Sequence, residues 1–301
     1  MQTVAFIVGF FLVGYLAKFR VNNAAFTVKW LNNYIIYLAM PSIILLKIPA
    51  LEFDVAMLLP AAFAWTWALL GGLSMLAISR LLSFPKPLEG AAILLAILGN
   101  TSFLGYPMVQ AFFDDEVLSY AIFYDQLGSF LMLSTAGLIL IAIYAPTGSG
   151  HTVSLFGVVK RVFTFPPFLA LIVASFLPIE PAVSALSGVL TILGQLLMPM
   201  ALVVIGLQFQ PQLLPEHRAP LICAIGLKML AAPMLAILML KFTTDNPAIV
   251  KATIFEAAMP CMITPGIMAI QAGLSPRFCA TLLGYSTLLS FVWLPLIASW
   301  L

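Results

Sequence analysis

The chain is built almost entirely of apolar runs that are separated by short clusters of charged and turn-forming residues. A helix needs about 20 mostly apolar residues to cross the hydrocarbon core of a bilayer, and charge or turn clusters mark its ends. We therefore expect an all-α polytopic membrane protein. The runs predict ten membrane-spanning helices, at residues 3–17, 27–47, 56–78, 89–112, 117–143, 165–178, 183–208, 219–240, 247–271 and 277–299.

The composition excludes most other classes of protein. Hydrophobic residues make up 63% of the 301 residues and charged residues 8%, whereas soluble proteins carry about 25% charged residues. So few polar groups argue against a soluble enzyme, a nucleic-acid-binding protein or a disordered chain, and make the lipid bilayer an expected partner. The three cysteines form no C-x-x-C pair, so we expect no metal site, no disulfide framework and no cofactor. The N-terminus shows no cleavage signal, which predicts a first span that is retained.

Basic residues are divided unevenly between the two sides of the predicted membrane. Two of them, Lys47 and Lys241, lie on the side that follows the even-numbered spans. Because cytoplasmic loops are rich in Lys and Arg, the other side is predicted to face the cytoplasm and both termini to lie outside. That other side holds nine: Lys18, Arg20, Lys29, Arg80, Lys86, Lys160, Arg161, Arg218 and Arg277.

Residues 145–164 form the longest polar stretch and divide the chain into halves, 1–144 and 165–301. The stretch begins with turn-forming residues and is expected to be a short cytoplasmic linker. Apolar residues then recur at helical spacing, which fits either a short amphipathic helix in the membrane interface or the start of the sixth span. Each half holds five predicted spans, and because five is an odd number the halves must have opposite orientations.

Similar features occur in the same order in the two halves. Residues 38–41 resemble 197–199, and the Gly- and Pro-interrupted stretch 99–107 of the fourth span corresponds to 259–266 of the ninth, with Asn100 aligned to Pro260. Inverted repeats with such paired interruptions are typical of secondary transporters, and the interruptions indicate the binding site. Three further prolines are expected to break or kink their helices: Pro41, Pro199 and Pro265.

The N-x-x-F-x-G-x-P run from Asn100 to Pro107 resembles the fourth-span signature of the auxin efflux carrier family. Residues 227–233, 257–260 and 285–295 are also similar to that family, so the resemblance covers the whole chain. It implies two inverted five-helix repeats, a scaffold and a transport domain each built from both halves, and broken helices 4 and 9 that cross. It also implies substrate bound beside the crossover, elevator-like movement and a homodimer.

Because the family includes bacterial carriers of malonate or malate, the resemblance implies a small organic acid anion as substrate and the bacterial inner membrane as location. The positive ends of half-helices suit a carboxylate, and Lys228 is a deep positive charge. Asn100, Thr101 and Ser102 have the alternative role of capping the broken helix. The substrate-binding candidates are Asn100, Thr101, Ser102, Gly105, Pro107, Met259, Pro260, Cys261, Thr264 and Lys228.

Two acids, Asp125 and Glu256, lie well inside predicted spans. A charge at such depth costs about 2.5–3.5 kcal/mol on insertion scales, so an acid there is a functional candidate. We expect either residue to carry a coupled proton or to bind a coupled sodium ion. The alternative is structural, as a partner of Lys228 or as the cap of a neighbouring helix.

Three other classes of function have some support in the sequence. The pattern at 284–287 fits an intramembrane serine protease, but a serine nucleophile needs a base within hydrogen-bond reach, and His151 and His217 lie in predicted loops. We therefore expect no enzymatic activity. A channel is disfavoured because no selectivity-filter motif such as T-V-G-Y-G occurs. The remaining alternative is a sodium-coupled symporter of the bile-acid type, which shares the ten-span crossover architecture.

Overall fold

The computed structural model describes residues 2–20, 23–49, 54–145, 154–176, 179–209 and 217–301, and all regular elements in these ranges are helices. Short π-helical or 3-10 turns interrupt several of them: η1 (Ile35–Ala39), η2 (Val55–Leu58), η3 (Thr101–Gly105), η4 (Tyr124–Phe130), η5 (Leu133–Gly137) and η7 (Gly226–Ala231).

The α-helices of the first half and of the linker are α1 (Gln2–Ala17), α2 (Ala24–Tyr34), α3 (Met40–Lys47), α4 (Leu59–Leu81), α5 (Lys86–Ile97), α6 (Tyr106–Phe112), α7 (Asp115–Phe123), α8 (Leu138–Tyr144) and α9 (Leu155–Phe163). Those of the second half are α10 (Pro166–Phe176), α11 (Glu180–Gln195), α12 (Leu197–Gln208), α13 (Arg218–Ile225), α14 (Ala232–Leu240), α15 (Pro247–Ala257), α16 (Ile263–Gln271) and α17 (Pro276–Trp300).

Helices long and apolar enough to cross a membrane are present at five of the predicted spans, which confirms an all-helical membrane fold. Within the described ranges these are Val55–Leu81, Asp115–Tyr144, Ala182–Gln208, Arg218–Leu240 and Pro276–Trp300. The other predicted spans correspond to helices that are short or interrupted, namely α1, α2–α3, α5–α6, α10 and α15–α16. The count of ten spans and the inverted repeat therefore stay predictions.

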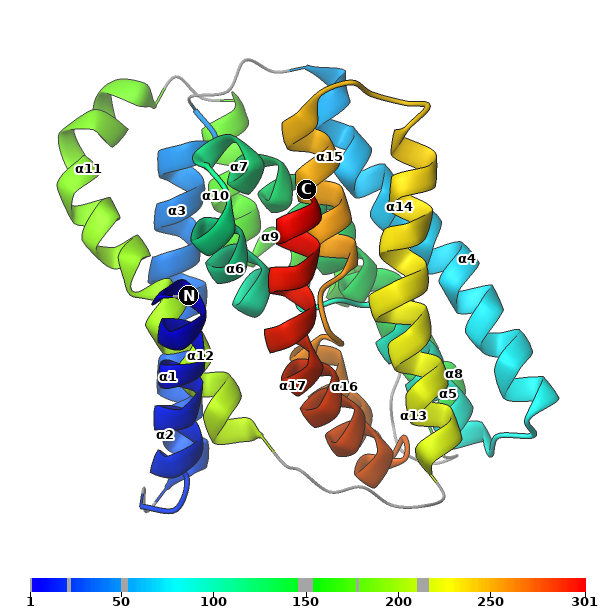
Figure 1. The fold of residues 1–301 in the computed structure, drawn as a ribbon. Coiled ribbons are helices and arrows are strands. Elements are labelled where there is room, and N and C mark those ends of the chain that lie inside the picture. The colour runs from blue at the N-terminus through cyan, green and yellow to red at the C-terminus, as the bar shows by residue number, and fades with distance from the viewer. Residues whose placement is uncertain (1, 21–22, 50–53, 146–153, 177–178, 210–216) are drawn as a thin grey trace.

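The helices form two groups that lie side by side (Figure 1). In the first group, α1 packs along α12, and α3 packs against α10 and α11, with α2 beside α12. In the second group, α4 packs on α5, α15 on α7 and α14, and α16 on α17, with α6, α8 and α13 attached to them. Each group contains helices from both halves of the sequence.

Glycine allows α1 and α12 to pack with their backbones in contact. A Cβ atom on Gly14 would lie 2.2 Å from the carbonyl oxygen of Val203, and one on Gly206 would lie 2.2 Å from that of Phe11. Small residues give membrane helices this close approach. The interface between α1 and α12 therefore depends on two specific positions, one on each helix.

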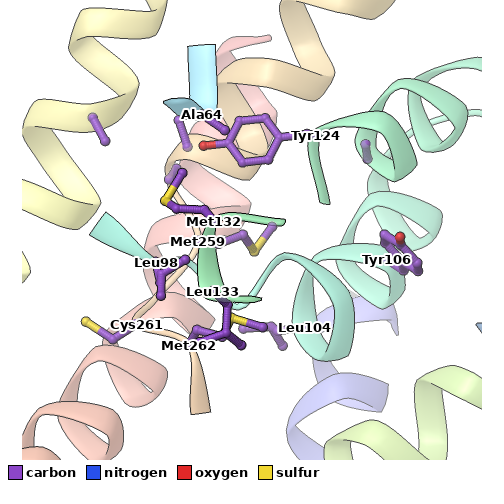
Figure 2. Packing of buried hydrophobic residues seen from close by; sticks show 14 of the residues in the cluster. Ala64, Leu98, Leu104, Tyr106, Tyr124, Met132, Leu133, Met259, Cys261 and Met262 are labelled. Atoms are coloured by element: carbon purple, nitrogen blue, oxygen red, sulfur yellow. The ribbon is translucent and has the colours of Figure 1, made fainter. Parts of the chain in front are cut away.

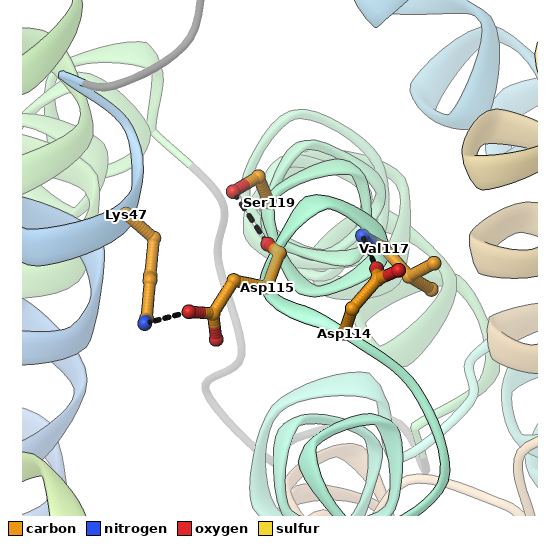
Figure 3. A network of polar contacts seen from close by, with 5 residues as sticks. All are labelled: Lys47, Asp114, Asp115, Val117 and Ser119. Carbon is orange, nitrogen blue, oxygen red and sulfur yellow. Dashed lines mark hydrogen bonds and ion pairs between the residues drawn. The ribbon is translucent and has the colours of Figure 1, made fainter.

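An ion pair joins the two groups at the edge drawn uppermost in Figure 1, where α3 ends and α7 begins. Lys47 of α3 donates to the carboxylate of Asp115, which lies in the first turn of α7 (Figure 3). The backbone N–H of Val117 donates to the Asp114 side chain, 3.1 Å away, which caps α7. The opposite edge in Figure 1 carries the turn between α1 and α2, the start of α13 and the turn between α16 and α17.

The structure decides between the two interpretations of the polar linker. Residues 146–153 lie outside the described part of the chain, but α9 is a separate helix that begins after the Ser154 cap and ends before α10. Leu155 and Phe156 on this helix are exposed, whereas Val162 is buried in a small cluster with Phe130 and Phe168. A short amphipathic helix is therefore correct, and the start of the sixth span is not.

Candidate functional site

Two interrupted helices meet side by side at the centre of the second group. The chain between α5 and η3 is extended at Leu98, and Pro260, which has no N–H to donate, lies in the extended chain between α15 and α16. The backbone N–H of Asn100 donates to the carbonyl oxygen of Pro260, 2.8 Å away. The N–H of Met262 donates to the carbonyl oxygen of Leu98 at 2.9 Å, so the two segments run antiparallel.

The bonds at this crossover relate the two halves with a register different from the one predicted. Each bond becomes the other if Leu98 is replaced by Pro260, Asn100 by Met262, and vice versa. In both pairs the two residues are separated by 162 positions. The sequence alignment of Asn100 with Pro260, a separation of 160, differs from this separation by two positions. The antiparallel bonds instead bring those two residues directly opposite each other.

The last turns of α5 and α15 are capped in the same way by side chains from preceding helices. Trp67 Nε1 donates to the carbonyl oxygen of Ala96 at 3.1 Å, and Lys228 Nζ donates to that of Ala257 at 2.6 Å. Trp67 and Lys228 are 161 positions apart, as are the two alanines. Lys228 thus satisfies a helix C-terminus, where a positive charge is favourable, a role that sequence reasoning missed.

Asp125, on η4, is fully buried and accepts four hydrogen bonds. The hydroxyl groups of Thr101 and Ser102 donate to its Oδ1 atom, the latter at 2.6 Å. Tyr106 Oη and Gln126 Nε2 donate to its Oδ2 atom at 2.8 and 2.6 Å. The carboxylate therefore lies at the N-terminal end of η3, and the hydroxyl groups predicted to bind substrate are occupied within the protein.

Asn100 and Glu256 are buried at the crossover with polar atoms that have no partner. Within the described residues, neither polar atom of the Asn100 amide and neither oxygen of the Glu256 carboxylate makes a hydrogen bond. The predicted capping by the Asn100 side chain is also absent. A Cβ on Gly105 would lie 2.6 Å from Glu256 Oε2, so the carboxylate packs against the backbone at this glycine.

The three deep charges do not form an ion pair with one another. The ion pairs found among the described residues join Lys47 to Asp115, and both Arg80 and Lys86 to Glu89. Lys228 makes its hydrogen bond to a backbone carbonyl rather than to a carboxylate. The predicted structural pairing of Lys228 with a deep acid is therefore not found in this part of the chain.

The remaining crossover candidates are close to one another. Met259, Pro260 and Cys261 are fully buried in the extended segment, where Leu98 and Met262 pack beside Cys261 (Figure 2). Thr264 is half-buried in the first turn of α16, followed by Pro265.

Two of the predicted prolines, Pro107 and Pro199, lie in the first turn of a helix, where a missing N–H is tolerated. Pro107 is in the first turn of α6. Pro41 follows η1 without any interruption of the helix, and Pro199 lies in α12 just after the break at Leu196. Pro41 and Pro199 belong to the first group.

A cavity of about 740 Å³ lies between the two groups and reaches the first residue of α16, Ile263. It is lined by α2, α12 and Lys18, the residue after α1, in the first group and by α16 and α17 in the second. No acidic side chain is among the described residues that line it. Sequence reasoning assigned its two lysines to loops and missed the cavity, whose polar lining residues are Lys18, Lys29, Asn32, Asn33, Gln208, Gln271 and Thr287.

Similarity to known proteins extends over the whole chain. Residues 1–298 match a family described as membrane transport proteins. The chain belongs to this family, the auxin efflux carrier family. An uncharacterised transporter from Methanothermobacter thermautotrophicus is 28% identical over 304 residues, which cover 98% of this chain and 96% of that protein. Another from Methanocaldococcus jannaschii is 30% identical over 226 residues, covering 71% and 70%.

Membership of the auxin efflux carrier family makes the chain a membrane transporter, and its apolar helices make it an integral membrane protein. The described residues contain no group of three or more His, Cys, Asp or Glu side chains placed to hold a metal ion.

Proposed function

We propose that the protein is a secondary carrier of a small organic acid anion. The observation that carries this proposal is the basic cavity that meets the N-terminal end of α16 at the crossover. The first N–H groups of a helix have no partner within it, and the helix dipole is positive there. Lys18 and Lys29 add positive charge to the cavity, and its amide side chains can donate hydrogen bonds to a carboxylate.

Comparison of the two half-helices favours the α16 side of the crossover for the substrate. In the first half, Asp125 already supplies a carboxylate at the start of η3. With the separation of 161 that relates Trp67 to Lys228, the residue that corresponds to Asp125 in the second half is Ser286, which is neutral. In the first half, the Asp125 carboxylate lies beside Thr101. We infer that the carboxylate of the substrate occupies the corresponding position in the second half, beside Ile263 and Thr264. Thr101 and Ser102 then act by holding Asp125, rather than as direct ligands.

Alternating access would follow from movement of the second group, as the transport domain, past the first, as the scaffold. The cavity lies between the groups and is lined by Lys18, directly after α1, and by Lys29 of α2. At the opposite edge the groups are joined by Lys47 and Asp115, whose side chains are 26% and 73% exposed. An exposed ion pair contributes at most about 1 kcal/mol, which suits a contact that breaks in each elevator-like cycle.

The proposal also includes the orientation of the protein in the membrane and its assembly into a dimer. We place the lysine-lined mouth of the cavity in the cytoplasm and both termini outside, because the basic residues favour that orientation. Family membership supports a homodimer in the cell's inner membrane. Asp125 and Glu256 remain the residues that could couple transport to a proton or sodium gradient. The protein would then need no cofactor.

Flux measurements in proteoliposomes test the proposed function. For a carrier we expect uptake of labelled malonate or another dicarboxylate that saturates with concentration and shows counterflow. Conductance that does not saturate would indicate a channel, and steep dependence on sodium would favour the bile-acid type of symporter. Asn100→Ala should reduce uptake, since Asn100 has a buried, unpartnered amide at the crossover. Equal uptake by wild type and variant would contradict the crossover site.

Lys29→Gln should raise the KM for a dicarboxylate by about two- to fivefold at low ionic strength, because an exposed charge attracts anions over a screened distance. The increase should disappear at high salt, while the maximal rate changes little. The matched control is Lys241→Gln, which removes an exposed lysine from the turn between α14 and α15, away from the cavity. If both variants raise KM equally, the cavity is not the route of the anion.

A further inference from the structure

We propose that Glu256 is the group that takes up a coupled proton, and that Asp125 and Lys228 are fixed charges that do not exchange protons during transport. This assignment rests on the proposed carrier function. The sequence alone does not decide which of the two acids, Asp125 or Glu256, carries the proton. The three buried charges differ in their hydrogen-bond partners.

Asp125 is surrounded by donors that stabilise its charged form. Each of its oxygens accepts two hydrogen bonds, from hydroxyl groups of η3 and from the side chains of Tyr106 and Gln126. Hydrogen bonds to a carboxylate favour the ionised state. The charge also lies at the N-terminal end of a half-helix, where it is favourable. A proton on Asp125 would disturb this arrangement, so the residue is suited to a constant charge.

Lys228 likewise has a fixed partner. Its ammonium group donates to the carbonyl oxygen of Ala257 at the C-terminal end of α15. The side chain is 1% exposed and packs against Gly99, where a Cβ would lie 2.9 Å from Nζ. There is no room for it to leave without moving the paired segments. Asp125 and Lys228 therefore carry opposite charges that balance one another.

Glu256 differs from both because nothing in the described part of the chain stabilises its charge by a hydrogen bond. Its carboxyl group packs against the backbone of Gly105. A buried ion without such partners is costly, whereas the neutral acid is much less so. Of these three buried charged residues, Glu256 is therefore the one that the structure favours in its neutral, protonated form.

The surroundings of Glu256 are consistent with this role on every side. The charged residues of α4, α7 and α17 lie in first or last turns, and Lys251 is the other charge on α15. Near the carboxyl group itself, Asp125 repels a second negative charge and Lys228 attracts it. The groups that interact electrostatically with Glu256 are Asp125, Lys228, Tyr106 and Tyr124.

In this step a hydronium ion of the aqueous side transfers one proton to a Glu256 oxygen and becomes water, so that one O–H bond forms and one breaks. Protonation leaves the crossover with one negative and one positive fixed charge. An anion then meets one negative charge fewer when it binds at α16. Proton and anion binding therefore favour one another, and the two are carried in the same direction.

A first experiment detects the proton without any substrate. Infrared difference spectra between low and high pH are recorded on the purified full chain, because a protonated carboxyl group gives a carbonyl band that a carboxylate lacks. We expect a band from a buried group in wild type and in the conservative variant Glu256→Asp, and its loss in Glu256→Gln. The matched control, Glu116→Gln, removes an exposed glutamate of α7 and should keep the band. A band that persists in Glu256→Gln overturns the assignment.

A second experiment measures coupling in proteoliposomes with labelled malonate. Uptake by wild type should increase with an inward proton gradient, and Glu256→Gln should lose this response. A retained response in Glu256→Gln, or a response of wild type to sodium alone, overturns the proposal. If wild type moves no organic anion, the proposed function fails, and the infrared band alone then decides whether Glu256 binds a proton.

Discussion

Asp125→Ala is expected to lower the free energy of unfolding by about 3–5 kcal/mol, since it leaves buried donors without their acceptor. Transport should be lost with it, because Thr101 and Ser102 at the start of η3 are held by this carboxylate. Thermal unfolding of the purified protein in detergent measures the first effect, and proteoliposome uptake measures the second.

The matched control for this prediction is Asp115→Ala. Its carboxylate is 73% exposed and forms an ion pair with Lys47, so its loss should change stability by less than about 1 kcal/mol. If the two variants unfold at the same temperature, the four hydrogen bonds of Asp125 do not stabilise the crossover as proposed. Asp125→Asn should lie between them, because one amide oxygen can still accept from two of the donors.

Gly206→Ala is the second substitution with a large expected effect. The new methyl group would lie 2.2 Å from the Phe11 oxygen and 2.7 Å from the Tyr15 nitrogen, both backbone atoms that cannot rotate away. The helices α1 and α12 must then separate, at a cost of about 1–3 kcal/mol or more. Uptake should fall as well, because both neighbours of Gly206 in α12 line the cavity.

The same helix pair provides a control for this prediction. A Cβ on Gly9 of α1 would meet nothing within 4 Å, so Gly9→Ala should leave the unfolding temperature unchanged or raise it slightly, as helix propensity favours alanine. Gly14→Ala, on the contact side of the same helix, should behave like Gly206→Ala. Wild-type stability of both contact variants would show that α1 and α12 do not pack this closely in the protein.

The interruptions of the fourth and ninth predicted spans were readable from the sequence because Gly99 and Pro260 are local signals. Glycine and proline disfavour the helix whatever surrounds them. The long helices were predictable for the same reason, since their apolar runs are continuous. The sequence does not decide between the short amphipathic helix α9 and the start of the sixth span, because a pattern of nine residues also fits the beginning of a longer helix.

What could not be predicted depends on contacts between distant residues. Lys228 was assigned to substrate because an isolated deep charge gives no sign of its partner, a backbone carbonyl 29 positions away. Trp67 and Lys228 both cap the end of a helix, but a sequence comparison does not pair them because an indole and an ammonium group are chemically different. The cavity cannot be predicted from the sequence because it forms only where α12 and α16 pack opposite its two lysines. The sequence pattern alone places these lysines in loops.

The most direct test of the account locates the anion itself. Crystals of the protein grown with bromosuccinate would reveal the bromine atom by its anomalous scattering. We predict a single bromine peak in the cavity at the N-terminal end of α16, beside Ile263 and Thr264. A peak on the other side of the crossover, against Asp125 and Ser102, or an anion bound elsewhere in the protein, would contradict the proposed site.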